Sequence, residues 1–144
     1  MLEKRMQAFQ ETCKQAGIKM TPQRMEIYRE LARTEEHPDA ETIYTRIRER
    51  MPNVSLDTIY RTLSLFEEMG LIQKVEVLSN RARFDANTDS HHHFVCKKCG
   101  VVHDFYSEEA DAFTPPDEVL SLGDVETVHV QVLGICSTCK AKMK

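Results

Sequence analysis

The 144-residue sequence predicts an α+β protein, with helices and a hairpin in the first half and a small strand-rich domain in the second. The hydrophobic repeat is helical up to about residue 70 and becomes strand-like after it. Two Cys-x-x-Cys pairs, at 96–99 and 136–139, lie in the second half. We expect a first domain over 1–84, a hinge over 85–90 and a second domain over 91–144.

Four helices are predicted in the first half from capping residues and helix breakers. The predicted starts and stops are Gly17, Thr21-Pro22, Pro38-Asp39, Pro52, Ser55 and Gly70. The third helix is expected to continue to Met51, and the fourth to run from Ser55 to Met69. Cys13 lies on the apolar face of the first helix, so we interpret it as a core residue.

The fourth predicted helix has one apolar and one polar face. Ile59, Leu63 and Phe66 share the apolar stripe, whereas Tyr60 and Arg61 lie on the other side. Strands over 71–78 and 81–85, joined around Ser79-Asn80, are expected to follow as a hairpin. Helices followed by a hairpin indicate a winged helix-turn-helix, in which the fourth helix would enter the major groove of DNA.

Charge and composition restrict the class of protein only loosely. The net charge is −4, and basic and acidic residues balance up to Asp85, with the acidic excess after it. Charge alone therefore favours DNA binding weakly. The sequence shows neither a run of apolar residues long enough for a membrane nor a signal peptide, so we expect a cytoplasmic protein.

The two Cys-x-x-Cys pairs predict a structural zinc site. Cys96, Cys99, Cys136 and Cys139 can supply four thiolates in tetrahedral geometry, and structural disulfides are rare in a reducing cytoplasm. The alternatives are a redox-active disulfide and free buried thiols. The second domain is short and poor in large apolar residues, so it needs a metal or a partner subunit to fold.

Histidines and aspartates near the first cysteine pair predict a second metal site. On a strand, His91 and His93 point to one face, and Asp85 and Asp104 flank them in the sequence. Imidazole with carboxylate suits Mn²⁺, Fe²⁺, Co²⁺ or Zn²⁺. The alternative is a solvated polar loop with surface histidines.

Two further histidines are weaker candidates, and a third is not a candidate. His37, before Pro38, is either a ligand or a loop residue, and His103 is a second possibility. His129 alternates with valines and is expected to point into solvent.

Taken together, the motifs resemble the ferric uptake regulator family over almost the whole chain. They are Thr21-Pro22-Gln23-Arg24, Val54-Ser55-Leu56-Asp57-Thr58-Ile59-Tyr60-Arg61-Thr62-Leu63, His91-x-His93-x-x-Cys96-x-x-Cys99 and the last Cys-x-x-Cys. The resemblance implies a homodimer with N-terminal DNA-binding domains and C-terminal α/β dimerisation domains, which represses transcription when loaded with metal.

Within the family the chain looks most like the peroxide-stress repressor branch, because Asp104 stands where iron-sensing members commonly have Glu. The resemblance implies a structural Zn²⁺ on the four cysteines and a regulatory Fe²⁺ or Mn²⁺. The implied regulatory ligands are His37, Asp85, His91, His93 and Asp104, and the implied targets of peroxide oxidation are His37 and His91.

The chain departs from the family at three positions. Tyr60-Arg61 matches iron regulators instead of peroxide repressors, and His92 stands where iron regulators often carry Asp. Val128 occupies the place of a histidine that many members have on the last strand, so we predict no third metal site.

We therefore expect a metal-dependent repressor, and not an enzyme, that binds a palindromic operator as a homodimer. The residues expected to contact DNA are Tyr60 and Arg61 on bases and Lys19, Arg24, Arg81 and Arg83 on phosphates. An iron-, zinc- or manganese-uptake regulator of the same family is the nearest alternative. A metal-dependent hydrolase and a zinc-stapled interaction module without DNA are further ones.

Overall fold

The chain forms two compact units, Met1–Thr88 and Asp89–Lys144. The structure is a computed structural model that describes residues 2–75 and 82–143. The boundary falls within the segment 85–90, although Asp85 belongs to a strand of the first unit. Both units together have the predicted α+β class. No helix in the described ranges is long and apolar enough to cross a membrane.

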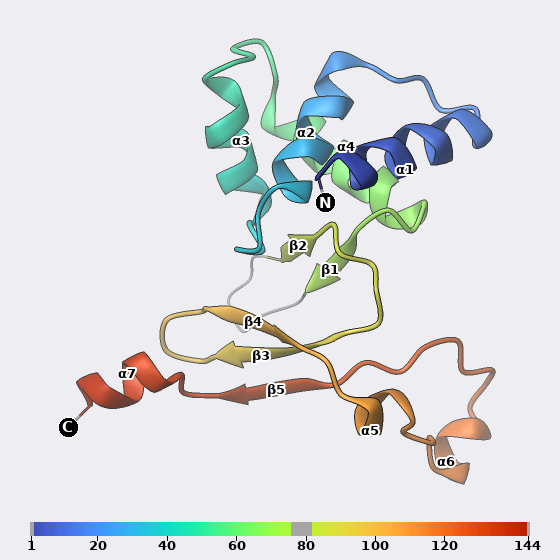
Figure 1. Ribbon diagram of the computed structural model, residues 1–144, viewed down its shortest axis with the longest axis vertical. Helices are drawn as coiled ribbons and strands as arrows, with labels where there is room; N and C mark the ends of the chain where they lie inside the picture. Colours follow the sequence, from blue (N-terminus) through green and yellow to red (C-terminus); the bar gives the residue numbers. More distant parts are fainter. Residues whose placement is uncertain (1, 76–81, 144) are drawn as a thin grey trace. The chain divides into compact units, whose positions relative to one another are not determined.

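The first unit contains four helices and a two-stranded sheet (Figure 1). Their bounds are α1 Leu2–Gln15, α2 Pro22–Ala32, α3 Ala40–Arg48, α4 Leu56–Glu68, β1 Gln73–Val75 and β2 Arg83–Asp85. The strands pair antiparallel, with Gln73 opposite Asp85 and Val75 opposite Arg83. The predicted hairpin is thus confirmed at its two strands, while its turn, Ser79-Asn80, lies outside the described residues.

Local capping fixes where three of these helices begin. The side chains of Thr21, Asp39 and Ser55 each accept a hydrogen bond from the backbone N–H three residues later. These starts agree with the sequence. The end of α3 does not: it ends at Arg48, short of the predicted Met51. Residues 49 and 50 form a turn instead, in which the N–H groups of Arg50 and Met51 both donate to the carbonyl oxygen of Ile47. Pro52 then prevents the helix from continuing.

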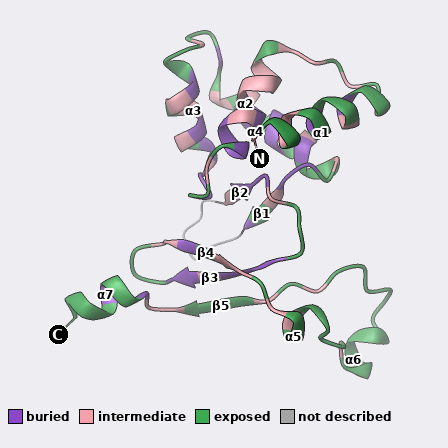
Figure 2. Cartoon of the chain, in the orientation of Figure 1, coloured by how far each residue is buried: buried purple, intermediate pink, exposed green. Residues whose placement is uncertain are grey.

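An aromatic cluster forms the centre of the first unit's core. Phe9 stacks on Tyr28 with ring centroids 4.3 Å apart, and Phe66 meets Phe9 edge-on at 5.2 Å. These rings come from α1, α2 and α4, so they hold the three helices together. Figure 2 shows the buried faces of these helices turned inward.

The second unit is built on a three-stranded sheet in the order β4-β3-β5. Strand β3 (His92–Cys96) pairs antiparallel with β4 (Val102–Phe105) and parallel with β5 (Gln131–Gly134). Three short helices complete it: α5 Glu108–Asp111, α6 Asp117–Leu120 and α7 Ser137–Lys142. Helices of four to six residues are too short to show a helical repeat in the sequence.

Candidate metal centres

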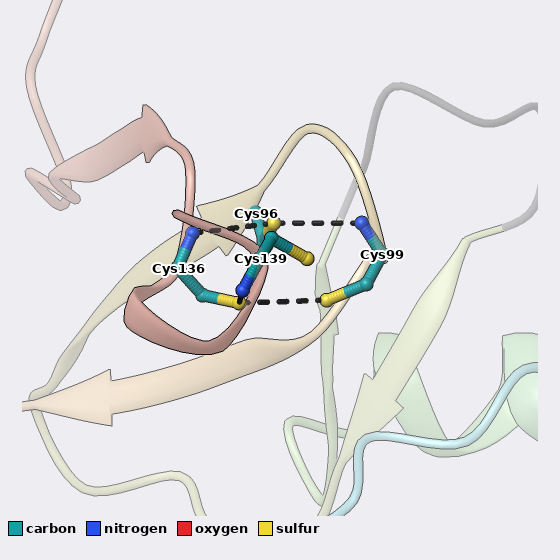
Figure 3. A group of neighbouring side chains, drawn as sticks. All are labelled: Cys96, Cys99, Cys136 and Cys139. Atoms are coloured by element: carbon teal, nitrogen blue, oxygen red, sulfur yellow. Dashed lines mark hydrogen bonds between the residues drawn. The ribbon is translucent and has the colours of Figure 1, made fainter. Parts of the chain in front are cut away.

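The four cysteines of the second unit converge, as Figure 3 shows. Cys96 ends β3 and Cys99 follows in the turn that Gly100 completes at a φ of 79°. Cys136 caps α7, and Cys139 lies within that helix. The ligand atoms of all four lie within 4.8 Å of one another. The sequence-predicted cysteine set is therefore brought together by a strand end and a helix start.

Backbone N–H groups surround the Cys96 sulfur. The N–H groups of Lys98, Cys99 and Cys136 donate to it at 3.3 to 3.4 Å. These three hydrogen bonds lower the pKa of Cys96 to about 5, and the bond from Cys136 has the largest effect. A hydrogen bond with the Cys136 side chain is the main cause that raises the pKa of Cys139 to about 12. The cluster thus favours a thiolate at Cys96 before any cation is bound.

The sulfur geometry fits a zinc ion. With Zn–S bonds of about 2.3 Å, two sulfurs of a tetrahedral site are separated by about 3.8 Å. The Sγ atoms of Cys99 and Cys136 lie 3.7 Å apart. No described cysteine forms a disulfide, so this spacing belongs to four thiols arranged as ligands.

Two of the predicted regulatory ligands meet in the first unit. Nε2 of His37 lies 3.3 Å from Oδ2 of Asp85, and both side chains are buried. His37 follows α2 at a positive φ of 55°, whereas Asp85 ends β2. The hairpin therefore carries the carboxylate to a histidine 48 residues earlier in the chain.

The other three predicted ligands meet in the second unit. Nε2 of His91 and Nε2 of His93 lie 3.5 and 3.2 Å from the same oxygen, Oδ1 of Asp104. The strand pairing explains this, because His93 is directly opposite Asp104 across β3 and β4. His91 and His93 share a face, as their spacing predicts. His103, the further candidate, is exposed on β4.

The protonation of His91 suits metal ligation. Its Nδ1 lies 2.6 Å from the carbonyl oxygen of Asp89. A carbonyl only accepts, so the proton is on Nδ1 and the lone pair is on Nε2, which faces Asp104. Such an N–H···O=C bond commonly orients a ligating histidine.

The nitrogen–oxygen distances fit paired metal ligands in both units. Two ligand atoms about 2.1 Å from one ion are separated by about 3.0 to 3.5 Å, depending on the coordination angle. The separations of 3.2 to 3.5 Å at Asp104 and 3.3 Å at Asp85 are in this range. Imidazole–carboxylate sets of this kind bind Mn²⁺, Fe²⁺, Co²⁺ and Zn²⁺.

His92, in contrast, uses both ring nitrogens within the protein. Its Nδ1 accepts the N–H of Val130 at 3.1 Å, so Nε2 carries the proton and donates to Asp111 at 2.8 Å. This hydrogen bond is the main cause that lowers the pKa of Asp111. Ser90 donates to the same carboxylate. His92 therefore joins β3 to α5 and to Val130, the residue before β5.

His129 is exposed but does not simply point into solvent. Its Nε2 lies 3.1 Å from Nδ1 of His93, which corrects the sequence interpretation. Alternation along a strand does not apply to it, because β5 begins only at Gln131. Sequence reasoning missed this contact, and also the partner of His92, because both contacts join segments far apart in the chain.

The residues predicted to contact DNA have different surroundings. Tyr60 and Arg61 are exposed on α4, where Arg61 forms an ion pair with Asp57. Arg24 donates to the carbonyl oxygen of the exposed Lys19 at 2.7 Å. Arg81 lies outside the described residues. Arg83 donates to backbone carbonyls instead of extending into solvent.

Known proteins resemble this chain over most of its length. Residues 15–132 match the model of the ferric uptake regulator family. The peroxide-responsive repressor PerR of Staphylococcus epidermidis is 34% identical over 127 residues, covering 88% of this chain and 85% of that protein. PerR of Staphylococcus aureus strain Mu50 is 33% identical over 129 residues, with 90% and 87% covered.

Solved structures show the same fold. The Helicobacter pylori ferric uptake regulator Fur has a TM-score of 0.78 at 24% identity, with 97% of this chain and 94% of that chain covered. A zinc-bound manganese uptake regulator has a TM-score of 0.66 at 30% identity, with 88% and 97% covered. The predicted resemblance is confirmed: this chain belongs to the ferric uptake regulator family, whose members are metal-dependent transcriptional regulators and not enzymes.

Proposed function

We propose that the chain is a cytoplasmic, peroxide-sensing repressor that binds a palindromic operator as a homodimer. Zn²⁺ occupies the four cysteines, and Fe²⁺ or Mn²⁺ binds to His37, Asp85, His91, His93 and Asp104. The relatives named as peroxide-responsive repressors, at 33 to 34% identity over most of the chain, support this assignment within the family.

The observation that carries the proposal is the division of the ligands between the units. His37 and Asp85 belong to the first unit, whereas His91, His93 and Asp104 belong to the second. Each set is incomplete by itself for a five-ligand site. A single ion that takes ligands from both sets would therefore fix one arrangement of the two units.

Such an ion gives a physical reason for regulation. A shift from mostly open to mostly closed protein requires about 5 kcal/mol of differential binding, which several metal–ligand bonds can supply. The first unit contains the winged helix, so the arrangement of the two units sets how two copies of α4 are presented to DNA. By reciprocity, DNA must tighten the binding of metal.

The exposed face of α4 is the surface proposed to read the operator. Tyr60 is 48% exposed, and the Arg61 side chain projects from the same face. An arginine can bind guanine edges in the major groove, whereas a tyrosine offers an aromatic surface and one hydroxyl. Lys19 and Arg24 would contact phosphates, which position the protein without reading sequence.

The resemblance to relatives named as peroxide-responsive repressors supports peroxide sensing through these ligands. When bound, Fe²⁺ supplies the reduction of peroxide, whereas Mn²⁺ does not. One oxygen atom of the peroxide would be inserted into a ring C–H bond of His37 or His91, with water as the other product, and an oxidised imidazole is a weaker ligand. The two units then lose their common connection and DNA is released.

The test is a gel shift on promoter DNA with zinc-loaded protein and added Fe²⁺, Mn²⁺ or Zn²⁺, each with and without peroxide. The proposal predicts that each regulatory metal increases DNA affinity and that peroxide abolishes the shift with Fe²⁺ alone. Mass spectrometry should then find oxygen on the peptides that contain His37 and His91. Oxidation confined to cysteines would refute peroxide sensing through histidine.

A metal-uptake regulator of the same family is the second candidate. The 30% identity to a manganese uptake regulator and the Tyr60-Arg61 pair favour it. In this case the gel shift responds to metal but not to peroxide, whichever metal is bound.

A further inference from the structure

The backbone of His37 has an unfavourable conformation. Its φ of 55° lies in the left-handed region, and no other non-glycine residue in the described part of the chain has a positive φ. Side chains clash with the backbone in this region, so the surrounding structure must hold such a residue in place. The following residue is Pro38, which restricts His37 further. Contacts from neighbouring residues must therefore hold the backbone of His37 in this conformation.

Strand β2 provides that stabilisation, residue by residue. The Arg83 guanidinium donates through Nη2 to the carbonyl oxygen of Glu36 at 2.8 Å and through Nε to that of His37. The N–H of Phe84 donates to the carbonyl oxygen of Pro38 at 3.1 Å. Three consecutive carbonyls, at 36, 37 and 38, are thus all bound by two residues of β2.

The spacing of Arg83 and Asp85 places both side chains against the segment that contains His37. Residues two apart on a strand point to the same face, so Arg83 and Asp85 both face the segment, while Phe84 points into the core. Arg83 binds the backbone of His37, and Asp85 meets its imidazole. Backbone and side chain of one residue are therefore positioned by the same strand.

The chemistry of arginine suits this role. A guanidinium is planar and rigid, and its donors can bind two neighbouring carbonyls at once. Lysine offers a single point of charge on a flexible stem and cannot reproduce that fork. Arg46 holds the segment from α3 as well, through an ion pair with the Glu36 carboxylate at 2.7 Å.

We propose that Arg83 is a positioning residue that holds His37 in its left-handed conformation and so aims Nε2 at the regulatory metal. This inference rests on the proposed function for the role of His37 as a ligand. It assigns to Arg83 a role other than the phosphate contact expected from the sequence. Since β2 belongs to the wing hairpin, it also connects the hairpin directly to the metal site.

Arg24 provides a matched control. Arg24, like Arg83, is expected from the sequence to contact a DNA phosphate. Its guanidinium also donates to a backbone carbonyl oxygen, that of Lys19. That contact joins the first turn of α2 to Lys19, which precedes the helix, and does not involve the His37 segment. If Arg83 acted only on DNA, the variants Arg83→Gln and Arg24→Gln would behave alike in metal binding.

The experiment measures Mn²⁺ affinity of the zinc-loaded full-length chain without DNA, by electron paramagnetic resonance. Arg83→Gln should weaken Mn²⁺ binding about tenfold or more, as expected when a contact that orients a ligand is lost. Arg83→Lys should fall between Arg83→Gln and the wild type, and Arg24→Gln should change the affinity less than twofold. Wild-type affinity in both Arg83 variants would overturn the proposal.

A double-mutant cycle shows whether Arg83 acts through His37. In a His37→Ala background, Arg83→Gln should cause no further loss of affinity. An equal loss in both backgrounds would mean that Arg83 acts elsewhere. If His37→Ala itself binds Mn²⁺ like the wild type, the proposed regulatory site is wrong, which is a separate outcome.

A measurement on protein without regulatory metal completes the test. The Phe84 N–H, which binds the Pro38 carbonyl, should exchange with solvent faster in Arg83→Gln and in Arg83→Lys than in Arg24→Gln. Unchanged exchange would contradict the proposal whether or not His37 binds metal.

Discussion

Removal of zinc from the four cysteines should unfold the second unit and leave the first unit folded. The reason is the difference between their cores. The first unit buries a large cluster that includes Phe9, Ile27 and Phe66. In the described part of the second unit, the buried apolar residues other than cysteines are Val95 and Val102.

Zinc binding is expected to contribute more free energy to the second unit than the burial of its apolar side chains. Full burial of an aliphatic side chain contributes about 1.5 to 3 kcal/mol, and the second unit has two such valines. Binding of a structural zinc ion to four ligands contributes about 10 to 16 kcal/mol at neutral pH. The metal is therefore expected to supply most of the stabilisation of the second unit.

The assay is hydrogen exchange of the full-length chain before and after treatment with a strong chelator. Amide protection in β3 and β4 should disappear, whereas protection in α2 and α4 should remain. Cys99→Ala should reproduce the effect, and the control Cys13→Ala should retain zinc, because Cys13 is buried in the other unit. Persistent protection of β3 in zinc-free protein would refute the reasoning.

Three further predictions concern single residues. His129→Ala should lower Mn²⁺ affinity about tenfold in equilibrium titrations, and His129→Gln much less, because Nδ1 of His93 loses the partner that orients it. Arg61→Ala should weaken operator binding in gel shifts without changing metal affinity, since Arg61 is exposed on α4. Cys13 is buried, which also raises the pKa of its thiol, so a thiol reagent should label it only after unfolding. Labelling of the folded protein would contradict this.

The parts of the fold that the sequence predicts well are governed by local interactions. Thr21 and Ser55 cap their helices through bonds to residues three positions later, and Gly70 ends α4 with a φ of 74°. The cysteine pairs and the shared face of His91 and His93 are also readable from spacing within a few residues. These features need no knowledge of how distant segments meet.

The parts that the sequence does not predict depend on distant contacts. Arg83 lies 46 residues from His37, and His129 lies 36 residues from His93. Neither contact leaves a periodic pattern, so Arg83 reads as a surface base and His129 as a solvent-facing residue. The short helices α5 and α7 are likewise invisible to periodicity. In each case the three-dimensional surroundings, and not the local sequence, decide what the residue does.

The central claim is that a single ion takes ligands from both units and thereby controls DNA binding. It is tested most directly by promoter affinity as a function of Mn²⁺ in His37→Ala and in Asp104→Ala, which each remove one ligand from a different unit. We predict that both variants retain zinc yet lose the increase in promoter affinity on addition of Mn²⁺. A wild-type metal response in either variant would contradict the claim.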